Sequence, residues 1–441
     1  MSMKRIMPSF LIILLGFLML TLVSSCDTDT DGDGVEDKID KEPNTPAKYI
    51  SSIDENGKAC IKSVYMLLDN TGSMNGYKNG GSEFLDAIST LAGSLNSCKT
   101  NQEVQNVIFQ NYGSDAPSSE LNFKDFSSLL ISPASKAGSN IVDHFDKLTN
   151  MVSDSTIGIY VTDAIISLND GKSAEMAAIC KSQLIPSCAR VLGKSENGAI
   201  ILRCKSKFNG SYQSSASPKK YLDLNDPARP YFIFIFGKRS SLDFLIDKTI
   251  KNNTALTDNV TDISFINYEP LAKIEASIDM NIPKGSWVLE DNTINSFGNS
   301  DIEVPIGIDL SFITNLKSNL ALDSKDIAIE NGEILGIDTK INFFANSPGV
   351  DKSAYPNATH IIKVKYTNDQ MGQSSKIYLK TNDWSKECST SDDSSVEAIR
   401  PKIGGRKTFE LDKIIGSIFQ ASEISKTNRN LHIATINFSK Q

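Results

Sequence analysis

Apolar residues in the first half of the chain follow two kinds of spacing. Short continuous apolar runs, each typical of a buried strand, occur at 64–68, 107–112, 157–162, 199–204 and 231–237. Apolar residues at helical spacing occur at 84–95, 141–152, 174–192 and 241–251. Strands separated by helices of this length predict a doubly wound α/β domain over residues 59–261. Within it, the Ser-rich stretch 205–229 is interpreted as a surface insertion.

The spacing changes beyond residue 262. Polar and apolar residues alternate at 274–280, 304–312, 360–366 and 375–380, with turn residues between these segments. Helical spacing returns at 407–420, and a last strand pattern covers 431–438. Residues 262–441 are therefore predicted to form a mostly β, sandwich-like C-terminal domain whose strands are mostly antiparallel.

The first 25 residues have the pattern of an export signal. Lys4 and Arg5 precede an apolar run at 10–22 that is too short to span a bilayer comfortably. Small residues then lead into Cys26, which resembles the lipobox of bacterial lipoproteins and implies that Cys26 is lipidated. The alternative is a plain secretory signal followed by an incidental cysteine.

Lipidation would anchor the protein in the bacterial cell envelope through acyl chains rather than through a membrane-spanning segment. The acidic residues after Cys26 resemble surface-export signals of some Gram-negative groups, which favours the outer membrane and the cell surface. In other groups Asp27 would signal retention in the inner membrane. The sequence leaves open which membrane holds the anchor.

Charge and histidine content restrict the chemistry. The 441 residues include 45 Lys and Arg against 53 Asp and Glu, which gives a formal net charge of −8. With no Lys/Arg-rich block, this balance argues against nucleic acid as a partner. Three scattered histidines (His144, His360 and His432) do not supply a zinc site with several His ligands. Any bound hard cation would need oxygen ligands.

Residues 26–58 form an acidic spacer and linker that has the spacing of a calcium loop. In a twelve-residue segment with Gly34 at position 6, carboxylates occupy positions 1, 3, 5, 9 and 12, which are Asp29, Asp31, Asp33, Asp37 and Asp40. The segment resembles one thrombospondin type 3 repeat, and this resemblance implies bound Ca²⁺. A solvated acidic linker is the alternative.

Two predicted strands of the α/β domain end in aspartate. The first leads into Asp69-Asn-Thr71-Gly-Ser73, a later one into Asp163, and between them Gly138-Ser139-Asn140 precedes a helix. In a doubly wound sheet, ligands bind beyond the carboxyl ends of the parallel strands. The sequence therefore predicts that oxygen-bearing side chains from three loops meet at this edge.

These three segments resemble the metal-ion-dependent adhesion site of the von Willebrand factor type A (vWA) family. The resemblance implies a Rossmann-like domain and a Mg²⁺ or Mn²⁺ ion that binds an acidic side chain of a protein partner. Thr71 stands where the family has Ser, Ser139 where it has Thr, and Ala164 where it has Gly. The implied ligands are Asp69, Thr71, Ser73, Ser139 and Asp163.

Two other interpretations remain open. Asp69 and Thr71 could simply cap the turn after a strand, which would make the protein a structural envelope lipoprotein with a degenerate, metal-free vWA fold. Asp69 could also be the nucleophile of a phosphoryl-transfer enzyme. That enzyme class needs a Lys directly after the Asp or a second Asp two residues on, and Asn70 and Thr71 are neither. The sequence therefore favours a binding protein over an enzyme.

Six cysteines remain besides Cys26, an even number that favours up to three disulfides in an exported protein, although buried thiols are the alternative. Cys60 starts the first strand and Cys98 ends the following antiparallel helix, so both are expected at the edge opposite the predicted site. A Cys60–Cys98 disulfide is therefore predicted. The pairing of the others stays open: Cys180, Cys188, Cys204 and Cys388.

Overall fold

The computed structural model describes residues 38, 61–79, 82–112, 120–134, 140–166, 173–215, 221–268, 274–276, 286–290, 292–297, 300–380, 384–403, 405–423 and 430–440. Residues 61–441 fall into one compact unit. The predicted signal peptide (1–25), and all of the spacer 26–58 except Lys38, lie outside the described residues.

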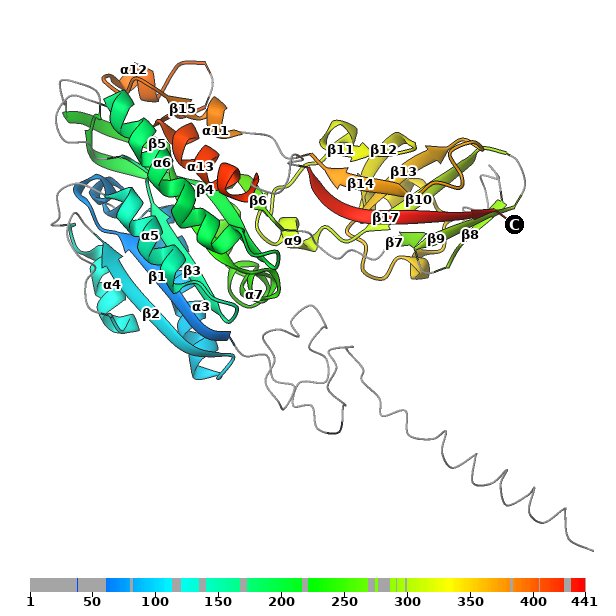
Figure 1. Ribbon diagram of the computed structural model, residues 1–441, viewed down its shortest axis with the longest axis horizontal. Helices are drawn as coiled ribbons and strands as arrows, with labels where there is room; N and C mark the ends of the chain where they lie inside the picture. The colour runs from blue at the N-terminus through cyan, green and yellow to red at the C-terminus, as the bar shows by residue number, and fades with distance from the viewer. Residues whose placement is uncertain are drawn as a thin grey trace, which may run out of the picture. The chain divides into compact units, whose positions relative to one another are not determined.

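A mixed six-stranded sheet forms the α/β domain (Figure 1). Its strands, in spatial order, are β2 (Val104–Tyr112), β1 (Ile61–Asp69), β3 (Thr156–Thr162), β5 (Tyr221–Lys238), β4 (Asn197–Gln213) and β6 (Val260–Ile266). Strand β1 pairs in parallel with both β2 and β3. Strand β5 is antiparallel to β3 and β4, and β6 is antiparallel to β4. The predicted α/β class is confirmed.

Helices cover both faces of this sheet. One face carries α5 (Ile141–Met151), α6 (Ser173–Leu192) and α13 (Leu411–Glu423), which lie in front of the strands in Figure 1. The opposite face packs against α3 (Glu83–Thr100) and α7 (Arg239–Leu245). Phe84 of α3 and Leu242 of α7 contact that side of β5. The remaining helical segments of this domain are the 3-10 turn η2 (Gly72–Met74), α2 (Asn75–Lys78), α4 (Phe123–Ile131), the π-helical turn η3 (Ile246–Ile250) and α8 (Thr254–Thr257).

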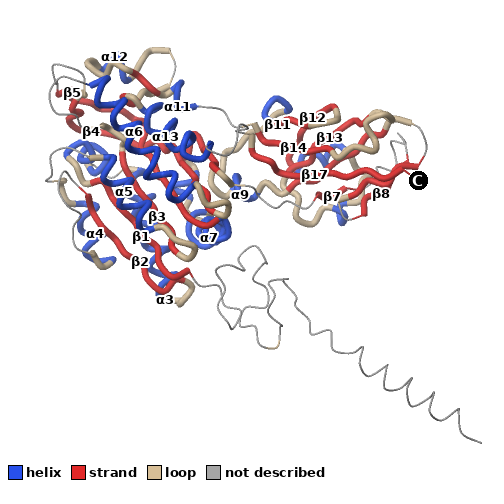
Figure 2. The backbone as a smooth tube through the Cα atoms, viewed as in Figure 1, coloured by secondary structure: helices blue, strands red, loops and turns tan. Residues whose placement is uncertain are grey.

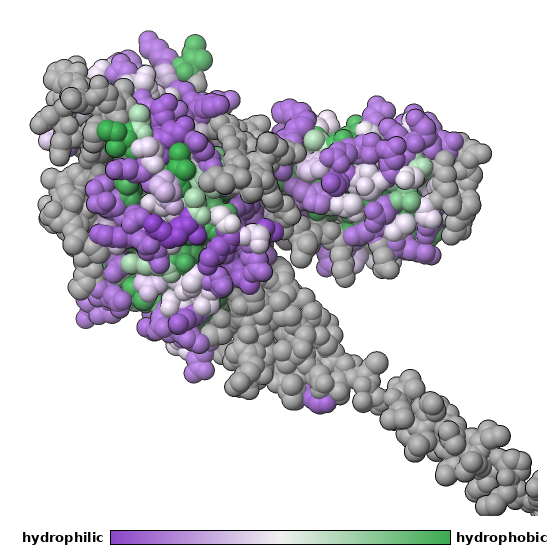
Figure 3. Space-filling model, in the orientation of Figure 1, coloured by the Kyte–Doolittle hydropathy of each residue, from purple (hydrophilic) through white to green (hydrophobic). Residues whose placement is uncertain are grey.

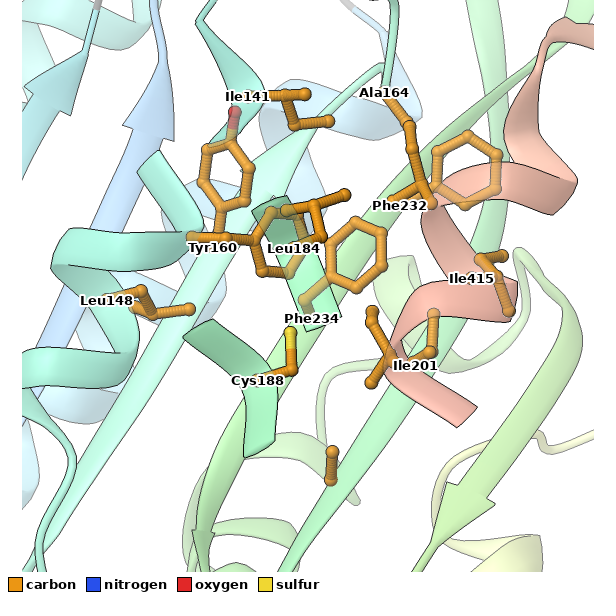
Figure 4. Packing of buried hydrophobic residues seen from close by; sticks show 14 of the residues in the cluster. Ile141, Leu148, Tyr160, Ala164, Leu184, Cys188, Ile201, Phe232, Phe234 and Ile415 are labelled. Atoms are coloured by element: carbon orange, nitrogen blue, oxygen red, sulfur yellow. The ribbon is translucent and has the colours of Figure 1, made fainter. Parts of the chain in front are cut away.

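Aromatic residues at alternate positions of β5 fill the core between the sheet and α5, α6 and α13. Phe232, Phe234 and Phe236 are fully buried, and the ring of Phe234 lies 5.0 Å from that of Phe145 in α5. Figure 4 shows Phe234 beside Tyr160 and Leu184 in this cluster. Burial of each such side chain contributes about 1.5–3 kcal/mol. The intervening residues of β5 face the other helix layer.

Residues 205–229 were predicted to be a surface insertion, and this prediction is wrong. Strands β4 and β5 continue through the stretch as a long hairpin, paired from Asn197–Lys238 to Gln213–Tyr221. Alternate residues of β4, including Phe208 and Tyr212, are buried. The Ser-rich composition hid this period-2 pattern, because small polar residues occupy both faces of the hairpin.

The C-terminal part is mostly β, as predicted (Figure 2). One sheet has the order β12 (Glu333–Thr339), β13 (His360–Tyr366), β10 (Ile302–Ile308) and β7 (Ile274–Ala276). The other has the order β11 (Ile327–Ile329), β14 (Ser375–Leu379), β17 (Leu431–Lys440), β9 (Thr293–Phe297) and β8 (Ser286–Glu290). The rings of Tyr366 and Phe438, one from each sheet, lie 4.7 Å apart. Short helical segments connect these strands: α9 (Ser311–Thr314), η4 (Ser324–Asp326), α10 (Lys340–Asn346) and η5 (Lys352–Ala354).

Between β14 and β17 the chain packs onto the α/β domain. This return segment, residues 384–423, contains α11 (Trp384–Glu387), β15 (Ser389–Thr390), α12 (Val396–Ile399), β16 (Thr408–Phe409) and α13. Trp384 stacks on Phe232 with ring centroids 6.3 Å apart, and α13 buries Ile414, Ile415 and Ile418 in the same cluster. The helix predicted at 407–420 therefore completes the helical layer of the α/β domain.

Large exposed apolar side chains are few among the described residues. They include Ile131, Tyr221, Ile341 and Ile403, on four different segments. Hydrophilic side chains predominate on the face shown in Figure 3. Every helix of the described residues is too short or too polar to cross a lipid bilayer.

Five cysteines are buried free thiols in this structure: Cys98, Cys180, Cys188, Cys204 and Cys388. At the amino edge of the sheet, Ile61 N donates to Glu103 O at 3.1 Å, and Glu103 N donates to Cys98 O at 2.9 Å. Glu103 therefore links the first residue of β1 to Cys98 through two backbone hydrogen bonds. Cys60 itself lies outside the described residues, so the Cys60–Cys98 disulfide stays a prediction.

Mass spectrometry of the denatured, unreduced protein tests this disulfide. We expect iodoacetamide to leave Cys98 unlabelled without reductant and to label it after reduction, because the thiol is consumed in the bridge. Cys204, which is buried as a free thiol in β4, is the control and should be labelled in both samples. Labelling of Cys98 in the unreduced sample would refute the bridge.

Glycines allow α2 to approach the β4–β5 hairpin closely. A methyl group at Gly76 would overlap the ring of Phe208, which is 1% exposed and packs edge-on against Tyr77. We expect Gly76→Ala to lower the free energy of unfolding by about 1–3 kcal/mol through overpacking. Gly416 in α13 has open space around its Cα, so Gly416→Ala should raise stability by up to about 1 kcal/mol. Urea unfolding of both variants checks these opposite signs.

Candidate functional site

The loop after β1 folds back on Asp69. The Asp69 carboxylate is fully buried, and its Oδ1 accepts a hydrogen bond from Thr71 N at 3.1 Å. Asp commonly forms this kind of local turn where a strand ends. The Thr71 and Ser73 hydroxyl oxygens lie 3.1 Å apart at the start of η2 (Gly72–Met74). A carboxylate and two hydroxyls therefore converge within five residues.

The second oxygen of Asp69 is held by β3. Oδ2 accepts a hydrogen bond from the Thr162 hydroxyl at 2.8 Å and a longer one from Tyr160 OH at 3.4 Å. Tyr160 OH is also 2.7 Å from Nδ1 of the buried His144. None of these three partners was predicted. Tyr160 and Thr162 do share one face of the strand that ends at Asp163, which was the only signal available in the sequence.

Asp163 lies at the carboxyl end of β3 and is 1% exposed. Its Oδ1 accepts a hydrogen bond from Ile165 N at 3.2 Å, whereas Oδ2 has no hydrogen-bond partner among the described residues. The Ser73 hydroxyl is close enough to lower the pKa of this carboxyl. The structure thus brings together the predicted Asp69, Thr71, Ser73 and Asp163.

Burial and the neighbouring Asp69 carboxylate raise the pKa of Asp163 from its usual value of 3.8 to about 7. A buried carboxylate beside another carboxylate is costly in its charged form, because little solvent screens the repulsion. The lack of a hydrogen-bond donor to Asp163 Oδ2 and the raised pKa of Asp163 both indicate that a negative charge on this carboxyl is poorly stabilised.

The residue after Asp163 adopts a conformation that favours glycine. Ala164 has φ of +56° and is fully buried. This left-handed conformation costs a residue with a Cβ about 1–2 kcal/mol. The cost is offset locally, because Ala164 N donates to the Thr162 hydroxyl at 3.0 Å and the methyl group joins the core cluster. Glycine at this position would adopt the same conformation without this cost.

Two buried cations flank the carboxylates. Lys78 is 8% exposed, and its Nζ donates to Asn70 Oδ1 at 2.6 Å and to two backbone carbonyl oxygens near the end of α4. Burial lowers the pKa of Lys78 to about 8, while the charge of Asp69 acts in the opposite direction. Arg229 is 1% exposed and lies close enough to lower the pKa of Asp163. Neither cation was predicted as part of the site.

The return segment holds the hairpin that carries Arg229. Buried Asp393 accepts hydrogen bonds from Tyr212 OH at 2.7 Å, Ser214 Oγ at 2.8 Å and Ser215 N at 2.7 Å. Ser215 Oγ in turn donates to Ile166 O at 2.8 Å, three residues after Asp163. This chain of hydrogen bonds connects residues 384–423 to the loop that follows β3.

Arg229 is fixed by the same segment. Its Nη1 donates to Lys407 O at 3.2 Å, and its guanidinium carbon lies 4.8 Å from the centroid of the Tyr212 ring. Nearby Asp226 forms an ion pair with Arg406 at 3.2 Å. A long-range contact to residues 384–423 therefore helps to fix the position of Arg229.

The donor set fits a divalent cation. Two carboxylates and two hydroxyls are hard oxygen ligands, as Mg²⁺ and Mn²⁺ prefer, and Asp163 Oδ2 is left without another partner among the described residues. Groups of three or more His, Cys, Asp or Glu side chains able to hold a metal ion are absent from the described residues. The candidate site differs from such a group, because two of its four described ligands are hydroxyls.

Several predicted site residues lie outside the described residues. They are the fifth metal ligand Ser139, the lipidated Cys26, and the calcium-loop residues Asp29, Asp31, Asp33, Asp37 and Asp40. Asn140, which follows Ser139, caps α5 by accepting a hydrogen bond from Asp143 N at 3.3 Å. The second-loop motif thus precedes a helix, as its sequence predicted.

Comparisons with known proteins identify no family for this chain. No protein-family model matches it, and no curated protein matches it. Among solved structures it aligns with the pilus adhesin SpaC from Lactobacillus rhamnosus GG at 9% identity and a TM-score of 0.18. The alignment covers 74% of this chain and 54% of the adhesin, so the chain spans about half the length of that protein. A similarity this low supports neither fold nor function.

The raised pKa of Asp163 predicts a stability that depends on pH when divalent metal is removed. Between pH 3.8 and about 7 the folded protein holds a proton that the unfolded chain has released, so stability should fall as pH rises through this window. We expect a loss of roughly 2–4 kcal/mol in EDTA, measured by urea unfolding. Asp163→Asn should remove most of this dependence. Parallel curves for the two proteins would contradict the buried, repelled carboxylate.

Proposed function

We propose that this protein is a lipid-anchored binding protein of the bacterial cell envelope. The signal pattern and Cys26 support the anchor, and the acidic spacer 26–58 supports a Ca²⁺-binding segment between the anchor and the α/β domain. The α/β domain would bind a protein partner that offers an acidic side chain, through Mg²⁺ or Mn²⁺. The proposed ligands are Asp69, Thr71, Ser73, Ser139 and Asp163.

One observation carries the metal proposal. Asp163 Oδ2 is buried with no hydrogen-bond partner among the described residues, beside a second buried carboxylate and near a hydroxyl. A buried, unpartnered carboxylate oxygen is expensive unless something neutralises it. A divalent cation at this position would satisfy Oδ2 and remove the repulsion from Asp69 at the same time.

A metal-free structural role is the second candidate, and the two buried cations favour it. Lys78 and Arg229 already provide positive charge next to Asp69 and Asp163. On this view the site is degenerate, and the α/β domain serves as a scaffold in the envelope. The two candidates differ in whether the protein binds a divalent ion at all.

A phosphoryl-transfer role has less support. Both oxygens of Asp69 accept hydrogen bonds, from Thr71 N on one side and from Thr162 on the other, and the side chain is fully buried. A nucleophilic carboxylate needs an oxygen that substrate can reach. A buried carboxylate held in this way is better suited to binding a metal ion than to attacking a substrate.

Isothermal titration calorimetry with Mn²⁺ tests the proposal. The full chain in detergent is titrated in the presence of excess glutarate, whose carboxylate stands in for an acidic side chain. We expect saturable binding to the wild type and affinity reduced by roughly tenfold or more in Asp69→Ala, because a charged ligand is lost.

Asp154→Asn is the matched control for this titration. Asp154 is exposed and precedes β3, at the end of the strand opposite to Asp163. Its removal should leave Mn²⁺ binding unchanged. Equal heats from wild type and Asp69→Ala would exclude the metal site and leave the structural role.

A further inference from the structure

The loop that carries Asp163 is tied to the other carboxylate of the candidate site at its start. Residues 163–166 are all buried. Ala164 N donates a hydrogen bond to the Thr162 hydroxyl at 3.0 Å, and this hydroxyl donates to Asp69 Oδ2 at 2.8 Å. The first half of the loop is therefore fixed relative to β1.

The second half of the same loop is tied to the β4–β5 hairpin. Ile165 N donates to Asp163 Oδ1 at 3.2 Å, so the backbone at this point holds one oxygen of the carboxylate. The next residue, Ile166, accepts a hydrogen bond on its carbonyl oxygen from Ser215 Oγ at 2.8 Å. Ser215 lies just beyond the end of β4. A shift of Ser215 would therefore move the backbone that orients Asp163.

The position of Ser215 is set by Asp393, a residue of the return segment. The Asp393 carboxylate is fully buried, and its Oδ2 accepts hydrogen bonds from Ser215 N and Tyr212 OH, both at 2.7 Å. Its Oδ1 accepts a hydrogen bond from Ser214 Oγ at 2.8 Å. Ser215 thus bridges Asp393, through its amide, and the loop after β3, through its hydroxyl.

The return segment in turn holds Asp393 in place. Asp393 lies between β15, which pairs with β16, and α12, whose first turn is capped by Ser395. The segment is also fastened to the hairpin by the ion pair between Arg406 and the buried Asp226, at 3.2 Å. Asp393 is therefore positioned by its own segment before it contacts Ser215.

We propose that Asp393 is a positioning residue for the candidate metal site, so that metal affinity depends on how the return segment packs on the β4–β5 hairpin. The inference rests on the proposed function and deepens it. Mg²⁺ demands near-ideal octahedral geometry with short bonds to its ligands, so a loop that holds Asp163 loosely would bind it weakly. Groups that orient metal ligands from outside typically change affinity by about 10–100-fold when they are removed.

The dependence works in both directions. By linkage, the factor by which the packed segment tightens metal binding equals the factor by which the metal favours the packed segment. The segment leaves the C-terminal sheets after β14 and rejoins them at β17. Metal binding at the α/β domain would therefore stabilise a part of the chain that belongs, in sequence, to the C-terminal part.

Two substitutions of Asp393 separate positioning from charge. Mn²⁺ affinity is measured by calorimetry on the full chain in detergent with excess glutarate. We expect Asp393→Ala to lower the affinity by about tenfold or more, and Asp393→Asn to keep most of it. The amide oxygen of Asn can accept from Ser215 N and Tyr212 OH, while its NH₂ group can donate to the Ser214 hydroxyl.

Ser215→Ala tests the link to the loop even if Asp393→Ala fails to fold. It removes the hydrogen bond to Ile166 and keeps the backbone hydrogen bond to Asp393. We expect a several-fold loss of Mn²⁺ affinity. Thr249→Val is the matched control, because the Thr249 hydroxyl is also buried and donates to a backbone oxygen, that of Leu245, at 2.6 Å in another part of the domain. This control should bind Mn²⁺ as tightly as wild type.

Hydrogen–deuterium exchange measures the reverse direction. We expect Mg²⁺ with glutarate to slow amide exchange in peptides covering residues 388–399 of the wild type, relative to peptides from α3. Ser215→Ala should lose this effect, because the link between the segment and the loop is cut. Unchanged exchange at 388–399 in the wild type, with metal bound, would overturn the linkage.

The outcomes separate this inference from the proposed function. Wild-type Mn²⁺ affinity in Ser215→Ala would overturn the positioning role and leave the metal site in place. Asp393→Asn as weak as Asp393→Ala would assign the effect to charge, and an equal loss in Thr249→Val would assign it to general destabilisation; either result would overturn the inference. Absence of Mn²⁺ binding to the wild type would overturn the proposed function, and the inference with it.

Discussion

Two carboxylates buried at the ends of neighbouring parallel strands are the constraint on which the rest of this site depends. Asp69 and Asp163 sit where β1 and β3 end, removed from water and close enough for one to raise the pKa of the other. A buried charge must be compensated by hydrogen bonds or by opposite charge. The hydroxyl of Thr162, the amides of the two loops and the cations Lys78 and Arg229 supply that compensation.

Much of this compensation comes from distant parts of the chain. Arg229 reaches the site on a long hairpin, and residues 384–423 hold that hairpin through Asp393 and Arg406. This segment leaves the C-terminal sheets after β14 and returns to them at β17. A segment that lies in sequence between two strands of the C-terminal sheets therefore helps to position a charge at the candidate site. No single point of the chain separates the two domains.

The division of the chain was easier to predict than its details. Apolar runs and helical spacing predicted the α/β class and the mostly β C-terminal part, because each element buries one face and its period shows in the sequence. The hairpin at 205–229 was missed, because serines occupy its buried face as well as its exposed face, as Ser206 at 1% exposure shows, and so mask a period of two. The site loops were predicted because Asp69 and Asp163 both follow strand patterns and parallel strands end at a common edge.

The sequence by itself determined which elements form and which oxygen-bearing side chains lie at the strand ends. Both follow from local periodicity and from the direction of parallel strands. Only the tertiary structure decided which charges surround those side chains. Lys78, Arg229 and Asp393 lie far apart along the chain, and nothing local distinguishes them from surface residues. Their burial depends on long-range packing. A buried charge interacts more strongly with its neighbours, because little water screens it.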